Sequence, residues 1–548
     1  MRLARLMTAL AALICPSALP AQAPRPPKLL VVISVDQFSA DLFAQYRAHF
    51  TGGLARIAQG AVFPSGYQSH AATETCPGHS TILTGNRPAR TGIIANTWLD
   101  QAARPDSPVY CAEDERVPGS TYRAYTPSSW HLLVPTLGER LQAADPATRV
   151  VAIAGKDRAA IMMAGHTPTS IWYFDPFAKR SFRTLPGRDA APPAEVVAAN
   201  ARLEKLLSRP AKGWRMPALC RAQAVPVPVA AGVTVGANDF ARAAGDGDSF
   251  RASPALDDAV LGLAEAQLKS MKLGRGAAPD VLAVGLSATD YVGHRYGTAG
   301  QETCAQLLTL DARLARFLKV LDGERVDYLV ALTADHGGHD APERNRDRAI
   351  PDAARVAADL SIADIGAAVG RELGIAGPVL RAAEIGDVYL DRALTPAERA
   401  RVLPIARMRL AAHPQVAAVF TAAEIAATPA ATGLPESWTL AQRIKASFLA
   451  GRSGDLVVVL KPRVTPIAKP TASYVATHGS PYDYDRRVPI LFWRPGMAGF
   501  EQPNSVETVD IAPTLAAVLG FPVPADAFDG RCLDLDRGPA STCAPAVP

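Results

Sequence analysis

Three short apolar runs, each followed by an acidic residue, are the strongest pattern along the chain. They span residues 28–35, 280–286 and 327–333 and are rich in valine, leucine and isoleucine. Nearly continuous apolar runs of this length are typical of strands buried on both faces of a parallel sheet. Helical periodicity at 303–321 lies between the last two runs and predicts a β-α-β unit with a right-handed crossover. The pattern therefore predicts an α/β fold: an α/β/α sandwich around a mostly parallel central sheet.

Further segments carry weaker patterns of the same kinds. Pro, Gly and aromatic residues interrupt the pattern at about 97–130 and 171–251, and 340–454 also departs from it. We expect these three ranges to be insertions that form cap segments over the sheet edge. The other predicted strands are 149–154, 455–460 and 488–493, and the other predicted helices are 40–59, 134–144, 254–272, 351–373, 395–412 and 511–519.

Acidic residues follow all three apolar runs: Asp36, Asp290 and Asp335. The carboxyl ends of parallel strands meet at one edge, where open α/β sheets bind ligands. A single acid after a strand is commonly only a turn former. Here, however, His294 lies four residues after Asp290, on the same face of a helical turn, and His336 follows Asp335 directly. The pattern therefore favours a shared site, although Asp290 and His294 also fit a surface pair.

The segment 68–85 carries a candidate nucleophile, Thr75. Pro77 and Gly78 break the backbone just before a helix-compatible run at 80–83. This places Thr75 at or just ahead of a helix N-terminus, where free backbone N–H groups and the helix dipole favour negative charge. A plain helix cap at Thr75, with Pro77 in the first turn, explains the same residues.

Far downstream, His478 lies in a loop with Gly479 and Pro481. Carboxylate oxygens and imidazole nitrogens suit Zn²⁺, and paired metal ions about 3.5–4 Å apart drive in-line phosphoryl transfer. His478 alone also fits a turn histidine. His79 and His339 adjoin candidate residues and fit either a supporting or a structural role.

The composition is ordinary for a globular protein, with 48% hydrophobic and 20% charged residues in a chain of 548. The net charge of +5 falls to +3 without the two arginines of the leader, which argues against nucleic acid as a specific partner. No segment after the leader holds 18 uncharged apolar residues, so we expect no membrane span.

The first 23 residues predict a secretory signal: two arginines, a short apolar stretch and a small-residue cleavage site at 21–23. The bulky Ile14 before Cys15 argues against a lipoprotein signal. We therefore expect a periplasmic or secreted protein. An even number of cysteines remains, which suggests disulfides in an oxidising compartment. Many pairings are formally possible, and sequence order favours Cys76–Cys111, Cys220–Cys304 and Cys532–Cys543.

Seven short motifs together resemble the alkaline phosphatase superfamily, in particular its bacterial periplasmic zinc alkaline phosphatases with a threonine nucleophile, which are related to type I phosphodiesterase/nucleotide pyrophosphatases. In chain order the motifs are Val-Asp36-Gln, Thr75-Cys-Pro-Gly-His-Ser, Gly92-Ile-Ile-Ala-Asn96, Gly155-Lys156-Asp-Arg158, Thr289-Asp290-Tyr-Val-Gly-His294, Thr333-Ala-Asp335-His336-Gly and Thr477-His478-Gly.

The resemblance implies one catalytic domain over 24–548 that hydrolyses small phosphate monoesters and releases inorganic phosphate. It also implies two zinc ions per chain and a covalent phosphothreonine at Thr75. It assigns one zinc to Asp290, His294 and His478, and the other to Asp36, Asp335, His336 and the Thr75 oxygen. It leaves open whether structural calcium accompanies the zinc. We expect a monomer, although the sequence does not give the oligomeric state.

Asn96, Lys156 and Arg158 resemble the residues that bind phosphate oxygens in this family. Two cations suit the dianion of a phosphate monoester better than the monoanion of a diester, because the extra charge is paired only in the monoester. A solvated basic turn around Asp157 is the alternative explanation of this motif.

Three other functions compete with a monoesterase. A phosphodiesterase or nucleotide pyrophosphatase on the same scaffold would lack the Lys156/Arg158 pair. A sulfatase needs a Cys-x-Pro-x-Arg register, whereas here Cys76 adjoins Pro77 directly. An exported binding protein with structural zinc would be expected to close its site with four protein ligands, often thiolates, which these motifs do not provide.

Overall fold

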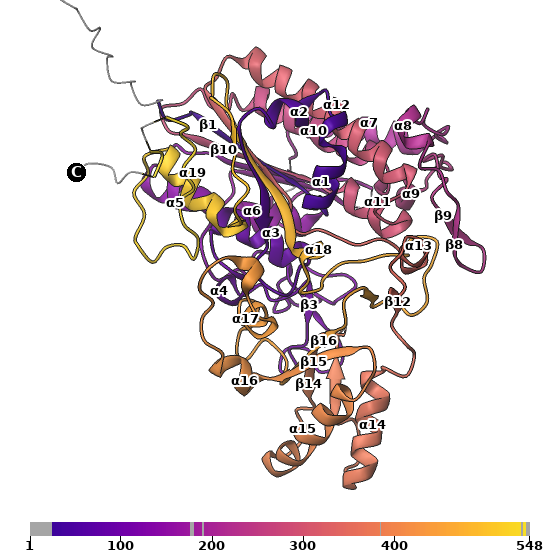
Figure 1. Cartoon of the computed structure of the whole chain (residues 1–548). Coiled ribbons are helices and arrows are strands. Elements are labelled where there is room, and N and C mark those ends of the chain that lie inside the picture. Colours follow the sequence, from indigo (N-terminus) through magenta and orange to yellow (C-terminus); the bar gives the residue numbers. More distant parts are fainter. Residues whose placement is uncertain (1–24, 176–179, 189–190, 384, 539–540, 544–548) are drawn as a thin grey trace, which may run out of the picture.

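A ten-stranded mixed sheet forms the centre of the computed structural model (Figure 1). The structure describes residues 25–175, 180–188, 191–383, 385–538 and 541–543, so the predicted signal at 1–23 lies outside the described residues. The strands in sheet order are β19 (Phe500–Glu501), β2 (Ala61–Tyr67), β18 (Arg487–Trp493), β11 (Tyr328–Thr333), β1 (Leu29–Val35), β10 (Asp280–Leu286), β5 (Val150–Ala154), β6 (Ser170–Asp175) and β7 (Ser181–Arg183), with β20 (Val506–Glu507) beside β2.

The three apolar runs form adjacent central strands. β1 lies between β10 and β11 and is parallel to both, and β5 and β6 continue the parallel part beyond β10. β18 runs antiparallel beside β11, and β2 runs antiparallel beside β18. The predicted α/β architecture with a mostly parallel sheet is confirmed.

Two helical layers cover the sheet because residues of β1 alternate between its two faces. Val31 and Ile33 join one apolar core, and Leu30 and Val32 join the other. Every residue of β1 is at most 1% exposed, so the strand is buried on both faces. Helices of the first layer are α1 (Ala40–Tyr46), α2 (Gly53–Ile57), α7 (Ala194–Leu207), α8 (Ala218–Arg221), α10 (Pro254–Ser270), α11 (Ala288–Tyr296) and α12 (Gln301–Glu324); those of the second are α3 (Thr75–Thr84), α5 (Leu137–Ala144), α6 (Asp157–Ala164) and α19 (Ile511–Val518).

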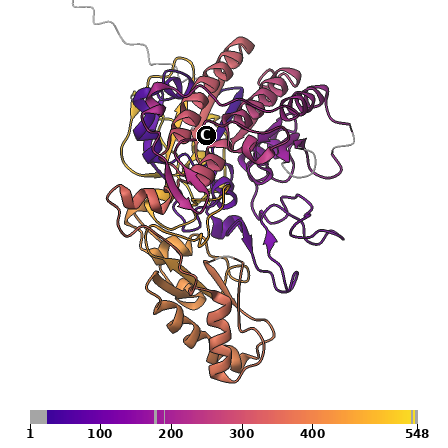
Figure 2. The same ribbon diagram turned by 90° about the vertical axis from the view of Figure 1, so that its right-hand side faces the viewer.

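A smaller lobe stands at one end of the molecule (Figure 2). Its antiparallel sheet has the order β13 (Leu380–Ala382), β14 (Asp387–Leu390), β16 (Leu456–Leu460) and β15 (Val416–Thr421). α14 (Ile362–Leu373) and α15 (Pro396–Ala411) pack on it around a separate apolar core. The remaining elements are α4 (Pro88–Thr91), α9 (Gly247–Arg251), α13 (Pro342–Asp347), α16 (Ala422–Ala427), α17 (Leu440–Lys445), α18 (Asp483–Arg486), β3 (Thr97–Trp98), β4 (Val109–Tyr110), β8 (Val227–Ala230), β9 (Val233–Val235), β12 (Ala354–Arg355), β17 (Val464–Thr465) and the 3₁₀ turns Arg47–His49, Pro435–Ser437 and Thr508–Asp510.

The prediction of one helix over 40–59 is wrong. The chain forms α1, a 3₁₀ turn and then α2, with a break before Gly53. The buried Asp311 carboxylate accepts hydrogen bonds from the backbone N–H groups of Thr51, Gly52, Leu54 and Ala55, at 2.7–3.3 Å. A carboxylate at this place satisfies the free donors of a new helix start, so a tertiary contact overrides the local periodicity.

Asp311→Ala is expected to lower the free energy of unfolding by about 2–4 kcal/mol, because it leaves several buried N–H groups without an acceptor. Asp322→Ala is the control on the same helix: its carboxylate is 40% exposed and pairs with Arg56 and the Tyr328 hydroxyl, so its loss should cost about 1 kcal/mol, less than the loss of Asp311. Urea unfolding under non-reducing conditions measures both. Equal losses for the two variants would contradict this role for Asp311.

Two further helix predictions start too early. The range 351–373 is helical only from Ile362, because the side chain of Ser361 accepts from Asp364 N and caps α14 there. The range 134–144 is helical only from Leu137, where Thr136 and Glu139 form a reciprocal capping box.

Five strands of the main sheet escaped prediction: β2, β6, β7, β19 and β20. β2 contains Pro64 and Gly66, and its pairing with β18 shifts register between Val488 and Ile490, as expected where proline interrupts a ladder. β6 lies at the start of the predicted insertion 171–251, yet it pairs in parallel with β5 and buries Ile171 and Phe174. That part of the range therefore belongs to the sheet and not to a cap.

Three disulfides link the chain as the order of the cysteines predicted: Cys76–Cys111, Cys220–Cys304 and Cys532–Cys543. The first joins α3 to the end of β4, and the second joins α8 to α12. Within the described residues, we find no helix with the length and apolar character needed to cross a bilayer.

Candidate active site

The strand-end acids meet at the carboxyl edge of the parallel strands. Asp36 follows β1 directly, Asp290 lies in the first turn of α11 after β10, and Asp335 lies just beyond β11. All three side chains are at most 1% exposed. The in-register pairing of β1 with both neighbours brings these segments together, as the parallel pattern predicted.

The N-terminus of α3 points to the same edge. Thr75 is the first residue of the helix, and Glu74 occupies the cap position. A Cβ at Gly78 would overlap the carbonyl oxygen of Asp335, so only glycine allows α3 to approach this closely. Thr75 is thus the buried first residue of a helix that lies directly against a strand-end acid.

Two groups of side chains present ligand atoms that all lie within 4.8 Å of one another. One group is Asp36, Asp335 and His336, and the other is Asp290, His336 and His478. The first is the protein ligand set that the resemblance implied for one ion. The second contains Asp290 and His478 of the other implied set, with His336 in place of His294.

His294 nevertheless lies beside the second group. Its Nε2 is 3.2 Å from Asp290 Oδ1, and Nε2 of His478 is 3.3 Å from the same oxygen. The helical spacing from Asp290 to His294 within α11 produces this contact.

The three imidazoles are each held by a backbone carbonyl at Nδ1. Nδ1 of His294, His336 and His478 lies 2.8 Å from the backbone carbonyl of Ala476, Gly337 and Thr73, respectively. A hydrogen bond from Nδ1 to a carbonyl sets the tautomer and leaves Nε2 free to bind a metal. All three rings are therefore held as ligating histidines usually are.

The donor atoms fit divalent cations. Among the described residues, the buried atoms without a hydrogen-bond partner include Asp36 Oδ1 and His336 Nε2. Asp290 Oδ1 and Asp335 Oδ2 have histidine nitrogens at 3.1–3.3 Å. Lys156 Nζ, at 2.7 Å from Asp36 Oδ2 and 2.5 Å from Asp290 Oδ2, adds one positive charge against three carboxylates. Buried carboxylates are costly unless they are paired or coordinate a metal, so further positive charge suits this cluster.

Burial and the neighbouring charges shift the pKa values of this cluster in different directions. Burial, reinforced by Asp335, raises the pKa of Asp36 well above its usual value. Burial also acts to raise the pKa of Asp290, but the charges of His294 and Lys156 outweigh it and hold that pKa well below the ordinary value. Burial lowers the pKa of His336 to about 3, which keeps its imidazole neutral as a metal ligand requires.

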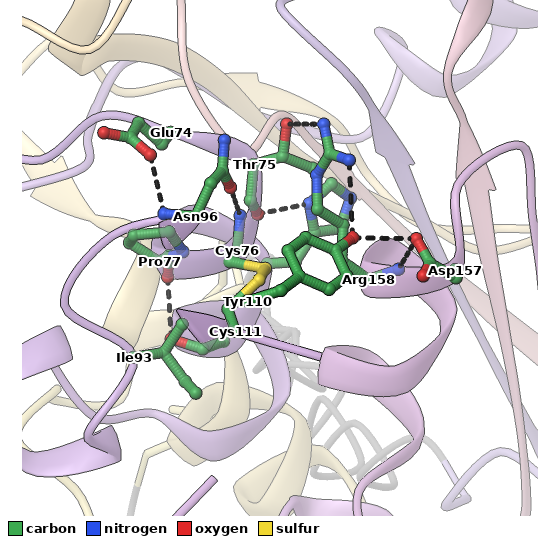
Figure 3. Close-up of a disulfide and its surroundings, with 12 residues drawn as sticks. Glu74, Thr75, Cys76, Pro77, Ile93, Asn96, Tyr110, Cys111, Asp157 and Arg158 are labelled. Carbon is green, nitrogen blue, oxygen red and sulfur yellow. Dashed lines mark hydrogen bonds between the residues drawn. A yellow bond between two sulfur atoms is a disulfide. The ribbon is translucent and has the colours of Figure 1, made fainter. Parts of the chain in front are cut away.

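Two cations contact the Thr75 hydroxyl, and the amide of Asn96 lies beside the start of α3. Lys156 Nζ is 3.3 Å and Arg158 Nη2 is 3.4 Å from Thr75 Oγ1. Asn96 Oδ1 accepts from Cys76 N at 2.8 Å, which holds the amide beside the start of α3 (Figure 3). The structure thus brings together all ten residues that the sequence singled out. A cleft of about 1440 Å³ opens beside them and is lined by six of the ten: Asn96, Lys156, Arg158, Asp290, His294 and His478.

His79 and His339, for which the sequence allowed either a supporting or a structural role, have different surroundings. Nδ1 of His79 lies 2.8 Å from the Thr75 carbonyl and 3.1 Å from Asp335 Oδ2, so His79 supports a member of the first group. His339 instead contacts Thr465 Oγ1 at 3.0 Å and belongs to neither group.

Sequence reasoning missed the support around Arg158. Tyr110 and Tyr125 both donate to Asp157, and Tyr110 also contacts Arg158. Both tyrosines come from the range 97–130, where no periodicity marks a contributing element. The only sequence feature that pointed to this support was the position of Asp157 between Lys156 and Arg158.

The chain resembles known proteins over nearly its whole length. The sequence model of the type I phosphodiesterase / nucleotide pyrophosphatase family matches residues 30–481. Alkaline phosphatase PhoK of Sphingomonas sp is 54% identical over 525 residues, which are 95% of this chain and 93% of PhoK. Alkaline phosphatase PhoD of Zymomonas mobilis is 47% identical over 94% of this chain and 89% of PhoD. The crystal structure of wild-type alkaline phosphatase PafA superposes with a TM-score of 0.81 at 26% identity, covering 93% of this chain and 99% of PafA.

Proposed function

The chain belongs to the type I phosphodiesterase / nucleotide pyrophosphatase family and is an alkaline phosphatase, and on this premise we propose that it hydrolyses phosphate monoesters through a covalent phosphothreonine at Thr75. One observation carries the proposal: Lys156 Nζ contacts Thr75 Oγ1, Asp36 and Asp290 at once. The hydroxyl therefore lies beside both ligand groups. Because the chain is an alkaline phosphatase, the alternative of an exported binding protein is excluded.

Thr75 is the nucleophile of the proposed reaction. Its Oγ1 forms a bond to phosphorus while the bond from phosphorus to the leaving oxygen breaks, and water then hydrolyses the phosphothreonine and releases inorganic phosphate. The N-terminus of α3 favours the negative charge that develops there. The contacts of Thr75 Oγ1 with Lys156 Nζ and Arg158 Nη2 orient the hydroxyl for the attack.

Two zinc ions belong to the proposal. Asp36, Asp335 and His336 would hold one, together with the Thr75 oxygen, and Asp290, His294 and His478 would hold the other. Zinc lowers the pKa of a bound hydroxyl and compensates charge on the phosphoryl group. Structural calcium stays an open expectation.

Asn96, Lys156 and Arg158 would bind the phosphoryl oxygens. Lys156 and Arg158 place two positive charges within 3.4 Å of the nucleophile, which suits a dianionic monoester. Phosphodiesterase activity is the second candidate, because the matching family model is named for diesterases. The Lys156/Arg158 pair favours the monoester.

Export to the periplasm or the medium is also part of the proposal. The three disulfides support it, because such bonds persist in oxidising compartments. A monomer acting on small-molecule substrates stays a prediction, which size-exclusion chromatography with light scattering tests.

Removal of metal tests the proposed function. Treatment with a chelator is expected to lower hydrolysis of an aryl phosphate by about 100-fold or more, and added Zn²⁺ is expected to restore it. His478→Ala should lower both zinc content and activity, whereas His413→Gln, which changes a histidine paired with Asp359 outside both ligand groups, should change neither. Full activity of protein shown by elemental analysis to be free of metal would contradict the proposal.

A further inference from the structure

We infer that Tyr110 is a positioning residue that holds Arg158 at the nucleophile, supported by Asp157 and Tyr125. This inference rests on the proposed function, because Arg158 matters only if it binds the phosphoryl group.

A continuous chain of hydrogen bonds leads from the nucleophile to Asp157 (Figure 3). Arg158 Nη2 donates to Thr75 Oγ1 at 3.4 Å, and Nη1 donates to the Tyr110 hydroxyl at 3.5 Å. The Tyr110 hydroxyl in turn donates to Asp157 Oδ1 at 2.9 Å. Tyr110 therefore stands between a guanidinium and a carboxylate, accepting from the first and donating to the second.

This arrangement preserves the donors of Arg158. A direct two-pronged pair with Asp157 would occupy two N–H groups and compensate the positive charge. With the phenol interposed, Arg158 Nε remains buried without a hydrogen-bond partner among the described residues, and Nη2 points to Thr75. The guanidinium is thus oriented while its charge and donors stay available to a phosphoryl group.

Asp157 is held from two other sides. Its Oδ2 accepts from the Tyr125 hydroxyl at 2.6 Å, and its Oδ1 accepts from the backbone N–H of Arg158 at 2.8 Å. The rings of Tyr110 and Tyr125 lie 4.6 Å apart, centroid to centroid. The acceptor that orients the Tyr110 hydroxyl is therefore itself immobilised at the start of α6.

A covalent link fixes Tyr110 relative to the nucleophile. Cys111 follows Tyr110 and forms a disulfide with Cys76, which follows Thr75. The path Thr75–Cys76–Cys111–Tyr110 is closed into a ring by Arg158, which contacts both Thr75 and Tyr110. The disulfide therefore keeps the backbone of Tyr110 close to that of Thr75.

Tyr110→Phe tests the inference, because it removes only the hydroxyl. We expect kcat/KM for an aryl phosphate monoester to fall by about 5- to 30-fold and inhibition by inorganic phosphate to weaken, whereas kcat/KM for an aryl phosphodiester falls by less than about 3-fold. Tyr328→Phe is the matched control: it also removes a phenol that donates to a carboxylate, Asp322 at 2.7 Å, but at the far end of β11. It should leave all three quantities unchanged.

The same substitution in an Arg158→Ala background separates positioning from structure. If Tyr110 acts through Arg158, adding Tyr110→Phe there should lower monoester kcat/KM by no more than about 2-fold. If Tyr110→Phe lowered monoester kcat/KM by the same factor in the Arg158→Ala background as in the wild type, or had no effect in the wild type, the inference would be overturned and the proposed function would stand. No effect of Arg158→Ala itself on monoester hydrolysis would overturn both.

Discussion

Thr75→Ala is expected to lower kcat/KM for an aryl phosphate monoester by about 10³-fold or more, because it removes the oxygen that would receive the phosphoryl group. Thr75→Ser keeps a hydroxyl at the start of α3 and should retain far more activity than Thr75→Ala. The alanine variant should also fail to incorporate label when ³²P-labelled substrate is quenched in acid, whereas the wild type should carry phosphate on the peptide that contains Thr75.

Ser80→Ala is the matched control for this variant. Ser80 is another buried hydroxyl of α3, but it bonds to the Pro77 carbonyl at 2.7 Å and to Thr91 Oγ1 at 3.0 Å, within the fold. Its loss should affect stability more than turnover. Undiminished turnover by Thr75→Ala would contradict the assignment of Thr75 as the nucleophile, since no other residue is proposed for that role.

Lys156→Ala combined with Arg158→Ala is expected to lower monoester kcat/KM by about 10²- to 10⁴-fold, which corresponds to the loss of two charge-assisted hydrogen bonds. Diester hydrolysis should fall far less, because a diester carries one negative charge fewer. Kinetics on paired aryl mono- and diester substrates with the same leaving group measure the ratio directly.

Two controls accompany the double variant. Zinc content must be measured, because Lys156 also contacts Asp36 and Asp290 and its loss changes the charge around both ligand groups. Arg123→Ala with Lys461→Ala removes two other cations that line the same cleft and should leave the ratio of mono- to diesterase activity near its wild-type value. Equal losses on both substrates in the Lys156/Arg158 variant would count against the assignment of these residues to the monoester dianion.

The sequence predicted the sheet and its edge because both depend on local patterns. Apolar runs buried on both faces identify β1, β10 and β11, and parallel pairing then forces Asp36, Asp290 and Asp335 to one edge. Likewise, the spacing of Asp290 and His294 needs only one helical turn to bring them together.

What the sequence could not predict depends on contacts between distant segments. β2 contains a proline, and α2 starts where Asp311, more than 250 residues away, supplies the acceptor. The position of His336 in both ligand groups follows from how its ring lies, stacked 3.6 Å from that of His478. Tyr110 reaches Arg158 through a segment without regular periodicity, so only the folded chain reveals it.

Anomalous X-ray diffraction across the zinc absorption edge, from crystals of the zinc-loaded wild-type protein, tests the central claim most directly. Our account predicts two zinc peaks, one at Asp36, Asp335 and His336 and the other at Asp290, His294 and His478, with Thr75 beside the first. A single peak, or peaks away from this edge of the sheet, would contradict it.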